Sequence, residues 1–456
     1  MVKNAEIRLG MTLIPPKAAS SRASVEIRAG VQVAPGFSDG CETAFFLGKE
    51  SPDRLLHKTD VKLTPTGQAC AAFKWTPAGL SGKHDIVAVS RADGRTWRAS
   101  QELTILPADS ISTGLIGGAF WGFLHWSERE GRLWNRDLQR FTHDDWQQLV
   151  QAQHELGMDI IVPQEAFRNQ EYAGKHRIER DGYKGLAFYA SDLYPGRMSI
   201  GCADPLEAVF SAADRLGMHV FAPTGLYAWF DFSPASLEWH KRVAEELWNR
   251  YGHHPSFYGW YVSEEVGGNL GDSAPRREEI VAFFREFQPW CRAMAPDKPV
   301  MLASNCHDVP SALKYYPELL AHLDILCPFA FQRMPEGDLT GREAAQLLQG
   351  LCDEAGSHLW MDMEAFGFCP DMALYPRAMS EIAEEIETFS YFEKVICYQF
   401  PGIFNPPSGR IKPGGNATVE LYQQYREFYR NKLAGLTDNM TGTKDAGALA
   451  CEPVRA

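Results

Sequence analysis

Residues 155–163 read ELGMDIIVP, and the same arrangement returns as RLGMHVFAP at residues 215–223. Each stretch carries Leu-Gly-Met at the end of a helical pattern, a β-branched residue two positions later, and a proline that closes an apolar run. A glycine in the left-handed conformation ends many helices, and a short apolar run directly after it is typical of a buried strand. The two stretches therefore predict a repeated helix-to-strand module, with strands near 159–163 and 219–223.

Six further apolar runs alternate with helical patterns of about twelve to eighteen residues, which is typical of βαβ units. Eight consecutive β/α units close most naturally into a (β/α)8 barrel, because right-handed crossovers curl a parallel sheet in one direction. The alternative is an open doubly wound sheet, but its first turn would need a GxGxxG motif that is missing here. The six runs are LIGGAFWGF (115–123), FYGWYVSEE (257–265), VMLASN (300–305), DILCPFA (324–330), LWMDMEAF (359–366) and VICYQF (395–400).

The chain divides into three parts by sequence pattern. Residues 1–108 contain short alternating segments such as SVEIRAGVQV and HDIVAVS, separated by turn-rich stretches such as PGFSDG and ADGR. This rhythm predicts a small all-β sandwich of immunoglobulin-like type, to which we assign no function. The α/β barrel is expected over residues 109–433, and the polar, aperiodic residues 434–456 are expected to form a disordered tail.

Composition and charge exclude several classes of function. The chain is 45% hydrophobic and 23% charged, which is ordinary for a globular protein. Its net charge of -13 would repel a phosphate backbone, so we expect no nucleic-acid partner. No apolar run approaches the roughly 18 residues of a membrane span, and the first residues lack an apolar signal core. We therefore expect no membrane association and a cytoplasmic location, with the ten cysteines as buried free thiols.

Polar residues that follow the apolar runs are the first candidates for a site, because barrel active sites lie at the C-terminal ends of the strands. Carboxylates, amides and aromatic residues gather at these predicted ends. Such a mouth suits a neutral polyhydroxylated ligand, since ring faces stack on C–H surfaces while amides and carboxylates bind hydroxyl groups. We therefore expect a sugar-binding mouth that includes Trp121, Gln164, Glu165, Tyr227, Asn305 and Gln399.

The segment RYGHHPSFYGWYVSEE (250–265) is the most specific motif of the sequence. It resembles the fourth-strand motif of the clan A glycoside hydrolases, retaining (β/α)8 enzymes in which an HPS-type stretch leads through a Trp-containing strand to an Asn-Glu pair. Residues 254–256 and Trp260 match without a gap, and the resemblance places Glu265 at the acid/base position. Glu264 stands where these families usually carry an Asn that contacts the sugar 2-hydroxyl. The resemblance thus implies a substrate-binding Glu264 and a sugar, or a reaction, that departs from the usual one.

The same resemblance implies a nucleophile at the end of the seventh strand, often a Glu followed closely by an aromatic residue and Gly. HLWMDMEAFGF (358–368) supplies Glu364 in this setting. Carboxyl groups on strands four and seven would face each other across the mouth, as double-displacement hydrolysis requires. Glu265 would protonate the leaving oxygen and Glu364 would form the glycosyl-enzyme intermediate. A glycosidase is therefore expected, with retention at a carboxyl separation of about 5 to 5.5 Å and inversion at about 6.5 to 9.5 Å.

The resemblance extends over residues 112–432 in architecture and over these two segments in detail. Strand six is followed by phenylalanines where the family often has a Tyr beside the nucleophile, and strand eight ends in Gln399 where it usually has a Trp. Asp362 has the same strand parity as Glu364 and would be the active carboxylate if the strand ended earlier.

Two other functions compete with the glycosidase hypothesis. A barrel that binds a glycan without cleaving it would need no perturbed pKa at Glu265, whereas an acid catalyst needs a pKa raised toward neutrality. A metal-dependent barrel hydrolase would draw on His125, Glu128, Glu165 and Asn305, but the sequence contains no HxH or HExxH spacing at the first strand. We therefore expect an oligosaccharide or glycoside substrate, with no metal and no cofactor.

Overall fold

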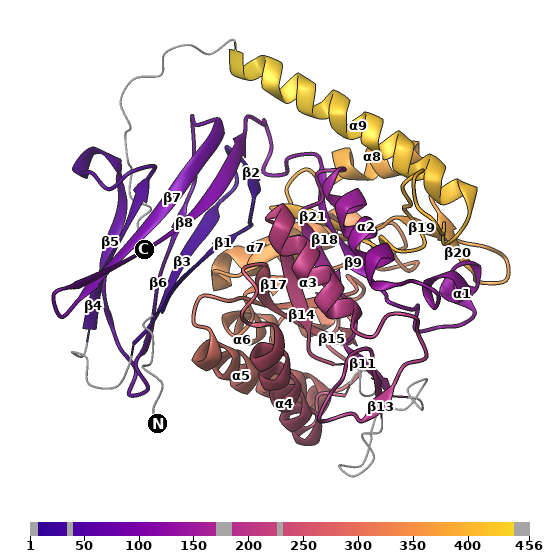
Figure 1. The fold of residues 1–456 in the computed structure, drawn as a ribbon, viewed down its shortest axis with the longest axis horizontal. Helices are drawn as coiled ribbons and strands as arrows, with labels where there is room; N and C mark the ends of the chain where they lie inside the picture. The colour runs from indigo at the N-terminus through magenta and orange to yellow at the C-terminus, as the bar shows by residue number, and fades with distance from the viewer. Residues whose placement is uncertain (1–7, 34–39, 170–184, 226–230, 442–456) are drawn as a thin grey trace.

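The computed structural model describes residues 8–33, 40–169, 185–225 and 231–441. A closed barrel of eight parallel strands forms its centre (Figure 1), and the last strand closes the ring by pairing with the first. The (β/α)8 barrel predicted from the repeated apolar runs is therefore confirmed. In barrel order the strands are β9 (Ile116–Trp121), β10 (Ile160–Pro163), β14 (His219–Pro223), β15 (Phe257–Val266), β16 (Val300–Ser304), β17 (Ile325–Leu326), β18 (His358–Glu364) and β21 (Lys394–Tyr398).

Helices cover the outside of the barrel, and their ends follow local sequence signals. Thr142 and Asp145 form a capping box at the start of α2, and Gly217 closes α3 with φ of 63°. Gly157, at the corresponding place after α2, has φ of 72°. The left-handed glycines predicted from the repeated Leu-Gly-Met are thus present. The helices are α1 (Asn135–Leu138), α2 (His143–His154), α3 (Pro205–Leu216), α4 (Pro234–Tyr251), α5 (Ala274–Met294), α6 (Tyr316–Ala321), α7 (Gly341–Ala355), α8 (Met379–Thr388) and α9 (Asn416–Thr441).

Strand register decides which side chains point into the barrel. Phe221 and Trp360 pack inside it, whereas Trp260 packs outward among the helices. A register shift between β14 and β15 inserts one extra residue in β15, so Tyr258 and Tyr261, three positions apart, both face the interior. This bulge sets the parity of the rest of β15 and therefore selects the side chains that reach its C-terminal end.

Two sheets at the N-terminus, antiparallel except for the parallel pair of β2 and β8, form a separate all-β sandwich domain (Figure 1). Its core lies between the sheets, where Ile27 and Ala29 of one sheet pack with Phe45 and Ile86 of the other. One sheet contains β1 (Arg8–Ile14), β3 (Val25–Gln32) and β6 (Gln68–Trp75). The other contains β2 (Ala18–Ser20), β8 (Arg95–Leu106), β7 (Gly82–Ala92), β4 (Gly40–Leu47) and β5 (Leu55–Lys62).

The sandwich contacts the N-terminal end of the barrel, where the strands begin. Ile14 belongs to the apolar cluster inside the barrel, and the hydroxyl of Tyr258 donates a hydrogen bond of 2.7 Å to the carbonyl of Leu13. The ammonium group of Lys394, at the start of β21, donates to the carbonyl of Ala18 at 2.6 Å. The C-terminal ends of the strands lie at the opposite face and are left open to a ligand.

Helix α9 lies along the outside of the barrel, close to α8, and holds the C-terminal part of the chain against it (Figure 1). The hydroxyl of Tyr425 accepts a hydrogen bond of 2.8 Å from the backbone N–H of Ile116 in β9. The predicted boundary at residue 434 falls inside this helix, which ends at Thr441. The sequence has no proline or glycine between Gly435 and Gly442, and each helical residue added to an existing helix gains a hydrogen bond. The remainder of the predicted tail lies outside the described residues.

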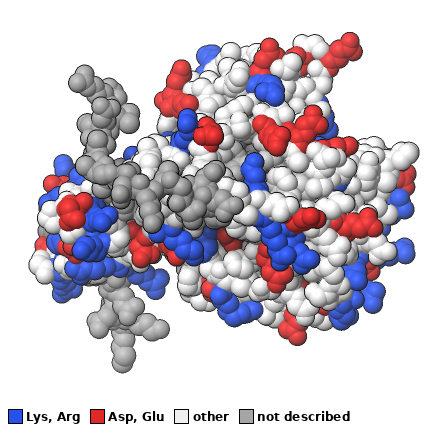
Figure 2. Space-filling model, turned by 90° about the horizontal axis from the view of Figure 1, so that it is seen from above, with Lys and Arg blue, Asp and Glu red and all other residues white. Residues whose placement is uncertain are grey.

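The surface matches the mixed composition of the sequence. Acidic and basic side chains are interspersed on the face that Figure 2 shows. Within the described part of the chain, no helix is both long enough and apolar enough to cross a membrane. The nine cysteines of the same ranges are all free, and seven of them are buried.

Candidate active site

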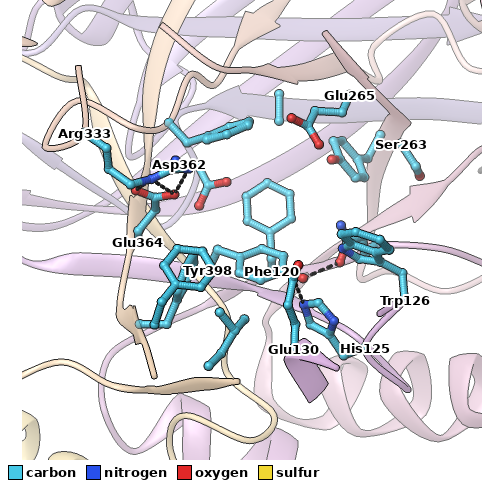
Figure 3. Close-up of a pocket in the computed structure, with 17 residues that line it drawn as sticks. Phe120, His125, Trp126, Glu130, Ser263, Glu265, Arg333, Asp362, Glu364 and Tyr398 are labelled. Carbon is cyan, nitrogen blue, oxygen red and sulfur yellow. Dashed lines mark hydrogen bonds and ion pairs between the residues drawn. The ribbon is translucent and has the colours of Figure 1, made fainter. Parts of the chain in front are cut away.

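A pocket of about 230 Å³ opens at the C-terminal ends of the barrel strands (Figure 3). Its lining combines carboxyl groups with aromatic rings, which suits a ligand with polar hydroxyl groups and apolar ring faces. The side chains come mainly from β9, β15, β18 and β21 and from the loops that follow the strands. They are Phe120, His125, Trp126, Glu130, Gln164, Tyr261, Ser263, Glu265, Ala303, Phe329, Arg333, Asp362, Glu364, Phe366, Phe368, Leu374 and Tyr398.

Strand β15 supplies one side of the pocket with every second residue. Tyr261, Ser263 and Glu265 line the pocket, because alternate residues of a strand share a face. Glu264 lies between two of them in sequence and is fully buried outside the pocket lining. The bulge near Tyr258 therefore decides that Glu265, and not Glu264, faces the ligand.

Glu265 is partly exposed to the pocket, and its environment favours the protonated form. Burial raises the pKa of Glu265 to about 7, and the negative charges of Glu130 and Glu364 act in the same direction. The Arg333 guanidinium opposes the shift without cancelling it. No cation in the described part of the chain forms an ion pair with Glu265. A carboxyl group with a pKa near 7 can donate a proton and take one back at neutral pH.

Glu364, at the end of β18, is held by a two-pronged ion pair. The Nε atom of Arg333 lies 2.8 Å from Oε2 of Glu364, and Nη2 lies 2.6 Å from Oε1. Arg333 belongs to the loop after β17 and extends over the pocket toward the strand (Figure 3). A planar guanidinium pairs in this way with an ionised carboxylate. The two glutamates thus differ: Glu364 is paired with a cation, and Glu265 is not.

Asp362 precedes Glu364 by two residues and projects from the same face of β18 into the pocket. Burial raises the pKa of Asp362 well above its usual range, and the charges of Glu364, Glu385 and Glu265 add to the shift. Its surroundings therefore favour the protonated form of Asp362.

The wall formed by β9, β10, β21 and the loop after β9 carries further hydrogen-bonding groups. The hydroxyl of Tyr398 donates a hydrogen bond of 2.9 Å to Oε1 of Gln164. Burial lowers the pKa of His125 to about 3, so its imidazole is neutral at pH 7. Its Nε2 atom lies 3.6 Å from Oε2 of Glu130, whose pKa is raised by burial. Trp126 lies beside this pair (Figure 3).

A hairpin of β19 (Phe366–Phe368) and β20 (Leu374–Pro376) forms the rim on the β18 side. The rings of Phe366 and Phe368 pack edge to face at 5.3 Å and both line the pocket. Asp371, at the tip of the hairpin, pairs with Arg132 at 2.5 Å, and its carbonyl accepts a hydrogen bond from Arg129. The 3-10 helix η2 (Glu130–Leu133) therefore holds the hairpin in place.

The pocket brings together three of the residues predicted from sequence. Glu265, Glu364 and Gln164 all line it. Tyr227 lies outside the described residues.

The other predicted binding residues lie outside the pocket lining, and each has a partner elsewhere. Trp121 faces the helices and donates its indole N–H to Gln153, while Phe120, one residue earlier, lines the pocket. Gln399 donates to the carbonyl of Pro401 at 2.9 Å, while Tyr398 takes the pocket position. In both strands the predicted residue lies one position from the residue that faces the pocket. Because successive side chains of a strand point to opposite faces, the predicted residue points away from the pocket.

Glu165 and Asn305 are engaged in structural contacts. The guanidinium of Arg168 pairs with Glu165, with Nε at 2.9 Å from Oε1. The side-chain oxygen of Asn305 accepts the backbone N–H groups of Gly268 at 2.8 Å and His307 at 3.0 Å. Among the described residues, no three His, Cys, Asp or Glu side chains form a group that could hold a metal ion.

Several pocket residues escape prediction from strand ends. Arg333 lies in a loop, eight positions after the start of β17, where no periodicity marks it. Tyr261 and Ser263 lie four and two residues before Glu265 on the same strand, so the alternation of side chains predicts that they share its face. Phe120 and Tyr398 required the correct strand parity, which the apolar runs alone do not fix.

The fold and the pocket define a (β/α)8 barrel with a candidate active site at the C-terminal ends of its strands. The chain belongs to the family described as a domain of unknown function, DUF4434, whose pattern matches residues 116–410. A "putative alpha-L-fucosidase" from Bacteroides thetaiotaomicron is 18% identical, with a TM-score of 0.52 over 69% of this chain and 93% of that one. A β-glucuronidase from Bacteroides uniformis is 14% identical, with a TM-score of 0.41 over 93% of this chain. The match covers 50% of the length of that β-glucuronidase. No curated protein matches the sequence.

Proposed function

We propose that this protein is a glycoside hydrolase in which Glu265 is the acid/base and Glu364 is the nucleophile. One observation carries the proposal: carboxyl groups from the fourth and seventh barrel strands line one pocket in unequal electrostatic environments. Pairs of titratable groups whose environments differ in this way mark acid and base roles. The proposal also agrees with the motif that ends in Glu265.

Glu265 has the properties that leaving-group protonation requires. With a pKa of about 7 it holds a proton at neutral pH and releases it when the glycosidic oxygen gains negative charge. After the aglycone leaves, the same carboxylate removes a proton from water. The raised pKa also separates this proposal from a barrel that only binds a glycan, since binding alone gives no reason for a perturbed carboxyl group.

Glu364 has the properties of the carboxylate that attacks the anomeric carbon. Its ion pair with Arg333 balances its negative charge before attack. Arg333 donates hydrogen bonds to Glu364, which the phenylalanines after strand six cannot do. In the first step a carboxylate oxygen of Glu364 bonds to the anomeric carbon, and the bond to the leaving oxygen breaks. In the second step water replaces Glu364 and restores the carboxylate.

The proposal is tested with a panel of aryl glycosides that vary in sugar and anomeric configuration. Once a substrate is found, Glu265→Gln and Glu364→Gln should each lower kcat by at least about 10²-fold while the circular dichroism spectrum stays unchanged. Glu102→Gln, an exposed change on the sandwich domain, is the matched control and should retain full activity. If both pocket variants kept wild-type activity, the two-carboxylate assignment would be wrong.

Two further measurements separate the roles of the glutamates. Glu265→Ala should retain its first step on a substrate whose leaving group needs no protonation, and added azide should restore turnover by attacking the intermediate. Glu364→Ala should show neither behaviour. Proton NMR of the first product should show the anomeric configuration of the substrate, as double displacement requires.

A further inference from the structure

Asp362 lines the pocket and carries a buried side-chain oxygen without a hydrogen-bond partner among the described residues. Its side chain is 5% exposed, and its Oδ1 atom has no hydrogen-bond partner among the described residues. Nearly all buried polar atoms in folded proteins have a partner, so an exception on a pocket wall marks a point where a ligand can supply one. No cation within the described ranges forms an ion pair with this carboxyl group.

The opposite side of the pocket repeats the arrangement. Ser263 precedes Glu265 by two residues on β15, as Asp362 precedes Glu364 on β18. Ser263 is 3% exposed, and its Oγ atom also lacks a partner among the described residues. Both side chains lie deeper in the barrel than the glutamate of their own strand. Each glutamate therefore stands above a buried polar group that is free to bind a ligand.

Burial and the charges around Asp362 favour its acid form. The cation nearest to the carboxyl groups, Arg333, is already paired with Glu364. Burial raises the pKa of Asp362 well above its usual range, and a backbone hydrogen bond at Tyr398 opposes the shift without cancelling it. The other titratable groups that interact with Asp362 are Glu265, Glu364, Glu385, Tyr261, Tyr398, Cys327 and Cys397, and each adds negative charge or none.

We propose that Asp362 is a sugar-binding group that remains an uncharged carboxylic acid and hydrogen-bonds a hydroxyl of the ring held between Glu265 and Glu364. A neutral carboxyl group has one O–H donor and one carbonyl acceptor, whereas a carboxylate only accepts. It therefore matches a sugar hydroxyl, which also donates and accepts. Ser263 provides a second, weaker contact of the same kind. The inference rests on the proposed glycosidase function and gives it a neutral, hydroxyl-bearing ring as substrate class.

The test uses asparagine as a mimic of the neutral acid. Asp362→Asn keeps a donor and an acceptor at the same place, so kcat/KM should stay within about 3-fold of wild type. Asp362→Val removes both and should lower kcat/KM by about 10- to 100-fold. Ser263→Ala should lower it by about 2- to 10-fold. Loss of activity in Asp362→Asn equal to that of Glu364→Gln would show an ionised, reacting Asp362 and would overturn the inference.

Infrared spectroscopy tests the proton independently of turnover. At pH 7 both proteins should show the carbonyl band of protonated Glu265, and the difference spectrum between wild type and Asp362→Asn should contain a further protonated-carboxyl band that belongs to Asp362. Absence of any difference between the two spectra would overturn the inference even if the glycosidase reaction is confirmed. If no glycoside is cleaved, calorimetry with the methyl glycosides of the panel replaces kinetics. Weaker binding to Asp362→Val than to Asp362→Asn would support the inference, and equal binding would contradict it.

Discussion

Two buried carboxyl groups at the N-terminal end of the barrel and two at its mouth lie in opposite electrostatic environments. At the N-terminal end, Glu26 and Asp324 both pair with Arg28 at 2.7 Å. Burial raises the pKa of each carboxyl group, but the neighbouring cations outweigh it and hold the pKa below the usual range. At the mouth, Glu265 and Asp362 have no such cation among the described residues, and their pKa values rise. At the N-terminal end the paired carboxylates fasten the sandwich to the barrel, whereas at the mouth Arg333 pairs with Glu364 and leaves Glu265 and Asp362 without an ion pair among the described residues.

His358 and His125, one at each end, show a similar contrast. His358, at the start of β18, lies 2.6 Å from Glu393 and 2.8 Å from Glu26. Burial lowers the pKa of His358, but the two carboxylates outweigh it and raise the pKa. His125, at the mouth, is equally buried, and its pKa falls to about 3. These two histidines are similarly buried, and the two carboxylates in close contact with His358 account for the opposite direction of its pKa shift.

The largest effect should come from breaking the paired end. Arg28→Ala leaves Glu26 and Asp324 buried without their shared cation and should lower the free energy of unfolding by about 3 to 5 kcal/mol. Urea denaturation measures the loss, and kcat/KM of the folded protein should stay unchanged. Lys83→Ala removes an exposed ion pair with Glu102 and should cost about 0.5 kcal/mol or less. Equal losses in the two variants would show that the network contributes no more than a surface pair.

The sequence carried enough signal for the barrel but not for this network. Apolar runs and left-handed glycines are local signals, so the eight strands and the (β/α)8 fold could be predicted. Arg28 and Asp324 are separated by 296 residues, and only the assembled domains bring them together. Neither residue stands out in its own segment.

The candidate site was predictable where a motif fixed the residue and unpredictable where parity had to be guessed. Glu265 lies in an ungapped motif, and Glu364 follows from the strand count. Phe120 and Tyr398 each lie one position from the predicted Trp121 and Gln399, because an apolar run does not show which alternate set faces inward. Arg333 comes from a loop, whose course no periodic pattern determines.

Ionisation of Glu265 and of Glu26 should change the free energy of unfolding with pH in opposite directions. Glu265 has its pKa raised to about 7 from the usual 4.5, so the folded protein binds this proton more tightly than the unfolded chain. Stability from this group is therefore lost as pH rises from about 4.5 to 7, whereas stability from Glu26 is lost as pH falls below 4.5. Because of Glu265, the free energy of unfolding of the wild type should fall by about 2 to 3 kcal/mol between pH 5 and 7.5, at about 1.4 kcal/mol per pKa unit. Glu265→Gln should not show this fall.

Urea denaturation of the wild type and Glu265→Gln at both pH values measures this difference. The activity of the wild type should fall above about pH 7, where Glu265 loses its proton. If the free energies of unfolding of the two proteins changed with pH in parallel, the pKa of Glu265 would not be raised in the folded protein. The proposed difference between the two ends of the barrel would then be wrong for Glu265.

The smallest effect is expected for the salt bridge between Arg132 and Asp371, which should matter for substrate binding more than for stability. Arg132 pairs with Asp371 at the surface, where both side chains are about half exposed, so Arg132→Ala should change the free energy of unfolding by less than about 1 kcal/mol. The pair holds the hairpin that carries Phe366 and Phe368 into the pocket. Loosening it by about 0.2 to 1 kcal/mol should therefore raise KM by about 1.4- to 5-fold, with kcat unchanged. A fall in kcat with constant KM would instead place the hairpin in the chemical step.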